Sequence, residues 1–473
     1  MMGILRTILF AATGLAATGA AFAQQTDSAS LFRTQREHAS PVAALAATAY
    51  ATPALRSEAF AGSLSEISVG YEMRREEKAL EQQKGDGGDF GRFSAGSYKH
   101  ISGKGTVWGD AGYLRGAKRN VVWNASSDYD LVFPYVVADS IGGDLTSEEY
   151  TFGGGYGHRS GRYTWALEAG ARALHEYRDS DPRIRNVAID IDAGAGASVR
   201  MGNYRLGLSA ALRVYKQSGS QIQYAHSAGE KGVYHLSGLG SHYAGFEGNA
   251  NSQTRYRGSG YGLTFALVPD AGRGGLHLAA GYEYLHIEKE LPGSADLVLQ
   301  KVVPRSFHAE AAWLRGSGNG LRWGVALKAR YDYRRGDEGI VDDNNSSQGS
   351  GTLGFLTLFE YSALQGRAEA VFGVEAAGHA WYVCPWGEYR RRTSDYLYPA
   401  QNMEFTRAGG GVDFRCVLQR RSLLLRLEAG GGYTAGLDSG LTLPVADLAA
   451  PLVRMVQYLS LIHISEPTRR VVI

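Results

Sequence analysis

The sequence lacks the features by which most enzymes and nucleic-acid-binding proteins are identified. No Cys or His residues have the spacing of a zinc site. The glycine triplets at 153–155 and 409–411 lie in or beside strand-like segments, where they indicate bulges or bends rather than a phosphate cradle. The formal net charge is +2, with no basic stripe or acidic tail, so nucleic acid is not indicated as a partner. We expect no catalytic residues, no cofactor and no metal.

Long hydrophobic runs are missing as well. No internal stretch approaches the ~18 consecutive apolar residues of a transmembrane helix. The short apolar run from Ile8 to Ala21 follows Arg6 and leads into Ala21-Phe22-Ala23, which has the pattern of a signal-peptide cleavage site. Residues 1–23 are therefore predicted to be a signal peptide.

Glycine and tyrosine are abundant instead, with 63 and 28 residues. From about Leu64 to Tyr433 the chain consists of segments with period-2 alternation. In 321–334 the odd positions are apolar and the even positions are largely polar or charged. Successive side chains of a strand point to opposite faces. A soluble sandwich also alternates in this way, but here many segments share aromatic ends.

The spacing of these aromatic ends fits a membrane. Trp323 and Tyr331 lie ~26 Å apart along a strand at ~3.3 Å per residue, or ~20 Å in height at a ~40° tilt, near the ~25 Å apolar band of outer-membrane barrels. We predict aromatic girdles, with the following candidates: Trp165, Trp323, Tyr331 and Tyr333.

The connections alternate between short and long, as in outer-membrane barrels with short periplasmic turns and longer external loops. The predicted tight turns are 160–162, 201–204, 272–275, 316–320, 365–367 and 419–422. The predicted long loops are about 178–186, 217–255, 288–305, 332–352, 383–402 and 434–452. With roughly 17 strand candidates and the even strand number of bacterial barrels, we predict an all-β, antiparallel transmembrane barrel of about 16–18 strands when intact, located in the bacterial outer membrane.

The polar faces of the strands define a lumen of mixed charge. A pore that selects one sign of ion would show a bias, whereas balanced charges suggest cross-strand pairs that fill the interior. The lumen candidates are Arg162, Glu168, Arg172, Asp190, Asp192, Arg213, Glu310, Lys328, Arg330, Glu360, Arg426 and Glu428.

The front of the chain does not follow the barrel pattern. Counting strands backwards puts the start of the first strand on the wrong side of the membrane, and the apolar segment 128–145 is too hydrophobic for an ordinary external loop. We predict that this segment, or residues 27–60, folds into the lumen as a plug; the alternative is a capping loop or an extra strand. The plug or loop candidates are Asp128, Tyr129, Phe133, Pro134, Tyr135, Asp139, Asp181 and Arg183.

Cys384 and Cys416 are the only cysteines, and in an exported protein an even count first suggests a disulfide. The predicted loop 383–402 and the turn 419–422 place them at opposite ends of a strand, ~30–40 Å apart at ~3.3 Å per residue. A disulfide needs Cα atoms within ~7 Å, so we predict two free thiols.

Some outer-membrane barrels are enzymes, and His308 and Glu310 share one strand face. A hydrolase of lipid or peptide substrates would need a serine beside them near the external rim, and no motif selects one. A third possibility is a structural or adhesive barrel that acts through the loops 217–255 and 332–352.

Three groups of residues resemble an uncharacterised family of outer-membrane β-barrels from Bacteroidota. They are Asp128-Tyr129-Asp130 with Phe133-Pro134-Tyr135 and 139–143, then Glu149-Tyr150 with 152–156, and Tyr177-Arg178 with Asp181-Pro182-Arg183 and Asn186. The resemblance implies a barrel without assigned catalytic residues that works beside a TonB-dependent nutrient transporter or a secretion apparatus.

The last residues of the chain do not resemble a natural protein sequence. Residues 459–469 are similar to a translated sequencing adapter, so 459–473 is predicted to be an artefact and the native chain to continue differently after Tyr458. The predicted organisation is a signal peptide (1–23), an N-terminal periplasmic or plug segment (24–61), an outer-membrane barrel (62–458) truncated at its C-terminus, and the adapter-like end. The expected function is porin-like transport, or an accessory part of an uptake or secretion complex, in contact with outer-membrane lipid.

Overall fold

The computed structural model describes residues 9–13, 28–79, 81–219, 233–243, 253–270, 274–292, 297–316, 320–341, 352–376, 378–420, 423–443, 452–458 and 468–472. Within these ranges, none of the helices has the length and apolar character needed to cross a membrane. The signal-peptide cleavage site and most of the adapter-like end lie outside the described residues, so both remain predictions.

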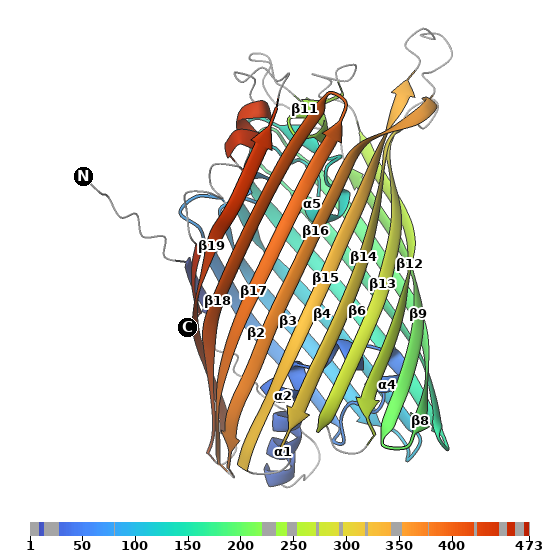
Figure 1. Cartoon of the computed structure of the whole chain (residues 1–473), viewed down its shortest axis with the longest axis vertical. Coiled ribbons are helices and arrows are strands. Elements are labelled where there is room, and N and C mark those ends of the chain that lie inside the picture. The colour runs from blue at the N-terminus through green and yellow to red at the C-terminus, as the bar shows by residue number, and fades with distance from the viewer. Residues whose placement is uncertain are drawn as a thin grey trace, which may run out of the picture.

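The chain forms a barrel of long antiparallel strands (Figure 1). Fifteen strands form its wall: β2 (Leu64–Arg75), β3 (Gly87–His100), β4 (Gly105–Val121), β6 (Gly143–Ser160), β7 (Tyr163–Tyr177), β8 (Arg185–Met201), β9 (Tyr204–Gly219), β12 (Thr254–Pro269), β13 (Gly275–Leu291), β14 (Leu297–Arg315), β15 (Gly320–Val341), β16 (Thr352–Glu375), β17 (His379–Leu397), β18 (Ala400–Arg420) and β19 (Leu423–Thr442). Each strand from β2 to β18 pairs with the wall strand that follows it in the chain. The predicted fold class is confirmed.

Two short strands lie between β19 and β2. β20 (Thr468–Val472) pairs with β19, and β1 (Leu9–Thr13) pairs with β20 and with β2, which brings the sheet to 17 strands. β1 lies in the predicted signal peptide and β20 in the adapter-like end. The wall of the predicted barrel domain is therefore the fifteen strands from β2 to β19.

The alternation predicted for 321–334 is confirmed in β15. Leu321, Val325 and Leu327 point outward and are 66%, 42% and 65% exposed, whereas Lys328 points inward and pairs with Glu369. Outward apolar side chains recur around the wall, and an exposed apolar surface of this extent is not stable in water. A closed antiparallel barrel with an apolar outer band is the architecture of outer-membrane proteins, so the protein is an outer-membrane barrel.

All four predicted girdle residues point outward. Trp165 and Trp323 lie near the short-turn end of the wall, where Trp165 contacts Tyr156 and His158. Tyr331 and Tyr333 lie further along β15. We assign the short-turn end to the periplasm, and the wall beyond Tyr333 to the external side of the membrane.

Two predicted connections are wrong. Residues 365–367 are not a turn, because β16 runs through them. Gln365 and Arg367 point inward on either side of Gly366. This polar, glycine-containing triplet has the composition of a turn. Residues 383–402 are not a long loop, because β17 and β18 continue to a turn at Tyr398-Pro399. Arg390 and Arg392 in this arginine-rich stretch point inward, whereas Arg391 points outward and pairs with Glu404. The other predicted long loops are shorter than expected because the strands extend beyond the membrane.

The reason given for the two free thiols is also wrong, although both cysteines are free. Cys384 lies opposite Asp413, and Cys416 lies opposite Trp381 on the adjacent strand. The thiols are therefore close in register. They point to opposite faces of the sheet, Cys384 inward and Cys416 outward, and this orientation prevents a disulfide.

An N-terminal plug closes the periplasmic end of the lumen (Figure 1). It comprises residues 28–60, with α1 (Ser28–His38), α2 (Pro41–Ala44), α3 (Ala47–Tyr50) and α4 (Pro53–Arg56). Pro41 and Pro53 each occupy the first position of a helix, where the missing N–H has no cost. The alanines at 46, 49 and 54 are fully buried.

A second segment fills the external end of the lumen. This external insert comprises η1 (Gln82–Lys84), residues 122–142 with α5 (Tyr129–Val132) and β5 (Val137–Asp139), then β10 (Val233–Gly238), β11 (Ser241–His242) and a helix at 452–458. β5, β10 and β11 form a three-stranded sheet. Residues 122–142 are not in the wall. Counting strands backwards without them places the start of β2 at the periplasmic end, which is the side expected for the first strand.

Candidate functional site: a lumen occupied at both ends

A polar chamber of about 770 Å³ lies between the N-terminal plug and the external insert. Inward side chains of β4 to β16 and the inner surface of α5 line it. The charged residues among them are Asp110, Asp130, Arg172, Asp190, Asp192, Arg213, Glu283, Arg330, Asp332 and Arg334. Its volume is within the range of small-molecule sites, so the plugged lumen retains space for a ligand.

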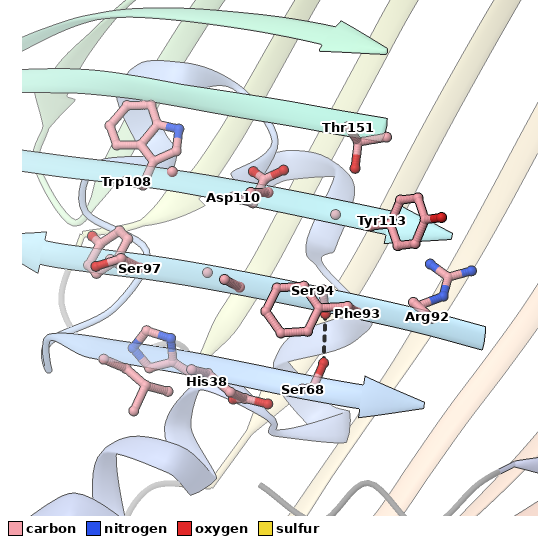
Figure 2. A pocket seen from close by; sticks show the side chains of 18 of the residues that line it. His38, Ser68, Arg92, Phe93, Ser94, Ser97, Trp108, Asp110, Tyr113 and Thr151 are labelled. Carbon is pink, nitrogen blue, oxygen red and sulfur yellow. Dashed lines mark hydrogen bonds between the residues drawn. The ribbon is translucent and has the colours of Figure 1, made fainter. Parts of the chain in front are cut away.

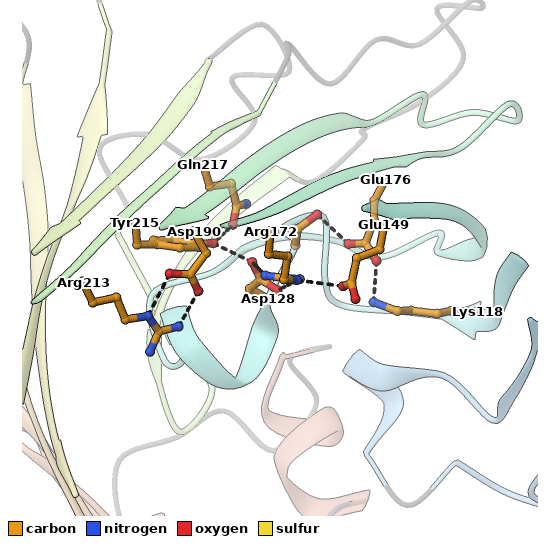
Figure 3. Close-up of polar contacts among 10 residues, drawn as sticks. Lys118, Asp128, Glu149, Arg172, Glu176, Asp190, Arg213, Tyr215 and Gln217 are labelled. Atoms are coloured by element: carbon orange, nitrogen blue, oxygen red, sulfur yellow. Dashed lines mark hydrogen bonds and ion pairs between the residues drawn. The ribbon is translucent and has the colours of Figure 1, made fainter. Parts of the chain in front are cut away.

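Arg172 joins the wall to the external insert (Figure 3). Its guanidinium donates to both carboxylate oxygens of Asp128, at 2.6 and 3.1 Å, and to Glu149 at 2.7 Å. Tyr215 on β9 donates to the same Asp128 carboxylate at 2.9 Å. Asp128 precedes α5 with a positive φ of 51°, so these contacts fix the position from which α5 begins.

A second ion pair lies beside the first in the chamber (Figure 3). Arg213 holds Asp190 with two hydrogen bonds of 2.8 and 2.5 Å. Asp192 lies opposite Arg213 in the register, and Glu283 faces the same chamber. Neither of these two carboxylates makes a hydrogen bond or an ion pair within the described ranges. The chamber therefore contains both neutralised and available charges.

The most buried ion pair lies behind the external insert. Arg178 contacts Asp139 at 3.3 Å, and both side chains have 0% exposure. Arg178 also donates to the carbonyl of Val121 at 3.2 Å. A buried pair of this kind is strongly destabilised when one partner is removed, so Arg178 ties the insert to the β7–β8 loop.

A row of three residues on neighbouring strands anchors the insert from the opposite wall. Lys289, Gln300 and Glu338 lie directly opposite one another on β13, β14 and β15. Lys289 donates to the carbonyl of Val136 at 3.3 Å and to Gln300 at 2.9 Å, and Gln300 donates to the carbonyl of Leu236 at 3.1 Å.

The third member of the row, Glu338, accepts a hydrogen bond from Tyr396 at 3.2 Å. Glu338 lies beyond the external girdle, where burial raises the pKa of its carboxyl to about 7. Burial lowers the pKa of the Lys289 ammonium well below its usual range. The row therefore contains two buried titratable groups, and the charge of each depends on the pH outside the cell.

Two of the predicted lumen residues do not line the lumen. Arg162 lies in the periplasmic turn after β6, where it donates to Tyr163. Glu360 points outward at the external end of β16 and accepts a hydrogen bond from Tyr333 at 3.2 Å. The prediction for Arg162 is wrong because the alternation of polar and apolar residues in β7 continues for one residue into the preceding turn. Glu360 was misplaced because a charge above the girdle is solvated on either face.

The other predicted lumen residues face inward. Glu168 lies 3.8 Å from Arg56 of the N-terminal plug, and Glu428 pairs with Arg415 at 2.7 Å. Arg426 lies opposite the inward Val417, and Arg330 pairs with Asp332 at 2.9 Å.

Most of the plug candidates lie in the external insert. Asp128, Tyr129, Phe133, Pro134, Tyr135 and Asp139 all belong to it. Tyr135 is 1% exposed and Asp139 is fully buried. Asp181 and Arg183 form a partly exposed ion pair in the external loop after β7.

His308 and Glu310 do not form a hydrolase site at the external rim. Both point into the lumen, and Glu310 accepts a hydrogen bond from Thr48 of the N-terminal plug at 2.7 Å. Ser306 precedes them on the same inward face, but within the described ranges no hydrogen bond joins the three side chains. A nucleophile and its base need hydrogen-bond contact, so this arrangement does not resemble a catalytic triad.

Several residues that organise the lumen were not singled out from the sequence. Lys118 donates to Glu176 at 2.5 Å (Figure 3). Ser127 donates to the same carboxylate at 2.5 Å. Glu149, Lys289 and Glu338 were also missed. The sequence offers no local signal for Lys289, because residues 285–291 read Leu-His-Ile-Glu-Lys-Glu-Leu and contain several charged side chains.

The described residues include no group of three or more His, Cys, Asp or Glu side chains that could hold a metal ion. A comparison with curated proteins finds no match. Among solved structures, the ferric citrate transporter FecA in the unliganded form has 9% identity and a TM-score of 0.32, with 78% of this chain and 68% of that chain covered.

The RagAB peptide transporter has 11% identity and a TM-score of 0.35. The match covers 80% of this chain and 49% of that chain. CdiB from Acinetobacter baumannii has 10% identity and a TM-score of 0.32, with 79% and 59% covered. This chain thus spans about half the length of the RagAB chain, and values this low say nothing about function.

A family profile gives a firmer result than these structures. It matches residues 53–461, which include the N-terminal plug from α4 onward, the fifteen wall strands and the external insert. The chain therefore belongs to the family of unknown function DUF6850.

Proposed function

We propose that the protein is a gated transport barrel of the outer membrane, and that movement of the N-terminal plug opens it. The supporting observation is a series of cavities through the lumen. Beside η1 and β3 lies an external cavity of about 440 Å³, which shares Asp130, Arg172 and Arg213 with the central chamber. The external insert therefore leaves a lateral route to the chamber.

The route continues from the chamber toward the periplasm. The chamber shares Asp110 and Thr151 with a cavity of about 420 Å³ beside the N-terminal plug. Phe60 separates this cavity from one of about 480 Å³ at the periplasmic mouth. The plug is thus the element that interrupts the series, and a pore interrupted by one movable segment is a gated transporter rather than an open porin.

The contacts of the plug suit a segment that moves. Leu55 packs on Gly207, Ala54 on Gly196 and Leu45 on Gly324, all inward glycines of the wall. The absence of side chains at these positions allows the backbones to approach closely. Small apolar contacts of this kind separate at little electrostatic cost. The ion pair between Glu58 and Arg205 also has to open, but Arg205 keeps Asp270 as a partner at 2.7 Å.

Single-channel conductance in a planar bilayer tests the proposal. The intact barrel should be silent, and deletion of residues 28–60 should produce steady open-channel current. A matched control is the exchange of Arg33, exposed on α1, for alanine, which should remain silent. Current through the intact barrel, or silence from the folded deletion variant, would contradict a gate at the N-terminal plug.

A role as an accessory component of a TonB-dependent uptake or secretion complex is a second proposal. α1 lies at the periplasmic end of the barrel (Figure 1), where a partner could pull on the plug. Co-purification of the full chain after mild solubilisation tests it, because an accessory barrel should elute with a stoichiometric partner. The alternatives of a rim hydrolase or an adhesive barrel have weaker support. His308 faces the lumen and Glu310 contacts the plug, and about half of the two long loops lies outside the described residues.

A further inference from the structure

The 420 Å³ cavity beside the N-terminal plug, called here the plug cavity, has the features of a ligand site (Figure 2). Its floor is the inward face of β2, β3 and β4, and its roof consists of His38, Arg56 and Phe60 from the plug. A ligand in this position would contact the wall and the plug at once.

Small side chains on the floor create the space. Ser68, Ser94 and Gly96 lie side by side on β2 and β3, and the two serine hydroxyls are 2.6 Å apart. A Cβ at Gly96 would meet no atom within 4 Å. The floor is therefore open rather than filled by a neighbouring side chain.

Two loosely paired sets of charges border the space. Arg56 and Asp110 are 3.8 Å apart, and Arg92 and Glu72 are 3.9 Å apart. Both separations exceed the 2.7–3.2 Å of a hydrogen bond, and all four side chains are more than 40% exposed. Glu66 also lines the cavity and makes no hydrogen bond or ion pair to any described residue. Charges of both signs are thus available to a ligand.

A buried donor at the cavity also lacks a partner. Trp108 is 6% exposed, and its Nε1 makes no hydrogen bond within the described part of the chain. The guanidinium of Arg56 lies 5.7 Å over the indole ring and holds the plug against it. Buried N–H groups normally have an acceptor, and a ligand oxygen would supply one.

We infer that the plug cavity binds a small zwitterion, such as an amino acid or a short peptide. Its carboxylate would be held by Arg56 or Arg92, and its ammonium by Asp110 or Glu66. Free cations and free anions would each meet a repelling neighbour, whereas a zwitterion satisfies both signs. The role of this site in uptake rests on the proposed transport function, because the cavity lies between the chamber and the gate at Phe60.

Titration calorimetry of the purified full chain in detergent tests the inference without requiring conductance. The probes are alanyl-alanine, its uncharged analogue N-acetyl-alaninamide, and maltose as a neutral hydroxyl-rich ligand. We expect alanyl-alanine to bind at least tenfold more tightly than either neutral probe.

Two variants locate the binding. Gly96→Phe fills the cavity and should weaken alanyl-alanine binding at least tenfold. The control Gly440→Phe lies on the outward face of β19, also in open space, and should leave binding unchanged. Three results would overturn the inference. They are neutral probes that bind as tightly as alanyl-alanine, no binding of alanyl-alanine at all, and a folded Gly96→Phe variant that binds it as tightly as the native protein. A silent plug-deletion variant would instead contradict the gate, so the two failures are distinguishable.

Discussion

The two segments that fill the lumen are attached to the wall in different ways. The N-terminal plug rests on inward glycines, and its polar contacts to the wall are partly exposed or run to backbone carbonyls, apart from Thr48 with Glu310 and Glu58 with Thr164 and Arg205. The external insert is joined to the wall at several points along the chain and is held by fully buried polar contacts, including Arg178 with Asp139. The comparison indicates a fixed external insert and a movable periplasmic plug.

The largest expected effect is the release of the external insert by Arg178→Ala. The substitution leaves the fully buried Asp139 carboxylate without its cation, which costs about 3–5 kcal/mol. Hydrogen exchange of the amides in β5 and β10 should accelerate on the order of 100-fold or more. The matched control is Arg183→Ala, which breaks the partly exposed pair with Asp181 at the same 3.3 Å distance and should cost about 0–1 kcal/mol. Similar effects of the two substitutions would show that burial does not fix the insert.

Next in size is a pH dependence of the insert that depends on Glu338. Its pKa is raised from 4.5 to about 7, so the folded state binds this proton more tightly than the unfolded state does. Protonation of Glu338 therefore contributes to the free energy of unfolding. This contribution is complete below pH 4.5 and is lost as the pH rises through about 7. It amounts to on the order of 3 kcal/mol, at ~1.4 kcal/mol per pH unit.

Hydrogen exchange of β10, corrected for the intrinsic rate, checks this prediction between pH 5 and pH 8. Relative to Glu338→Gln, which stays neutral, protection in the native protein should fall with rising pH. Lys289 cannot produce this fall, because a lowered ammonium pKa makes stability rise with pH. A Glu338→Gln variant with the native pH profile would therefore assign the effect to another group.

A smaller effect is expected at the N-terminal plug from Gly207→Val. A Cβ at Gly207 would lie 2.8 Å from Leu55, and overpacking of this kind costs about 1–3 kcal/mol. The variant should show brief channel openings in a planar bilayer. Gly194→Val on β8 is the control, because a Cβ there meets only atoms at 3.4 Å or more. Openings in both variants, or in neither, would contradict a plug held by close packing.

The smallest expected effect is that of Thr48→Val. It removes the hydrogen bond to Glu310, whose side chain is 2% exposed, at a cost of about 1–2 kcal/mol. The plug should become cleavable by a protease added from the periplasmic side, several-fold faster than in the native protein. The conservative Thr48→Ser retains the hydroxyl and should restore the native rate. If both variants are cleaved at the same rate, Glu310 does not help to dock the plug.

The wall could be predicted from the sequence because its pattern is local. In β15 the alternation and the aromatic ends identified the outward face correctly. The limits of β16 to β18 could not be predicted, because Gly366 and its polar neighbours have the composition of a turn, and the inward arginines of β17 have that of a loop. Composition alone does not distinguish a polar lumen from solvent.

The site was predicted less completely, since its contacts join segments that are distant in the chain. The apolar segment around α5 was correctly suspected of folding inward because it is too hydrophobic for an exposed loop. The partners of Asp128 were not predictable, because Arg172 and Tyr215 come from β7 and β9. The row of Lys289, Gln300 and Glu338 depends on the register of three strands, which no short motif encodes.

Native-state hydrogen exchange of the full chain in detergent tests most directly whether the two segments differ in mobility. The amides to compare are hydrogen-bonded in both segments, such as those of Ala44 and Arg56 in the N-terminal plug and those of Ala125 and Leu236 in the external insert. The plug amides should exchange through an opening of lower free energy, while the insert amides exchange only at the free energy of the wall. Equal opening free energies, or an insert that opens first, would contradict a fixed insert and a movable plug.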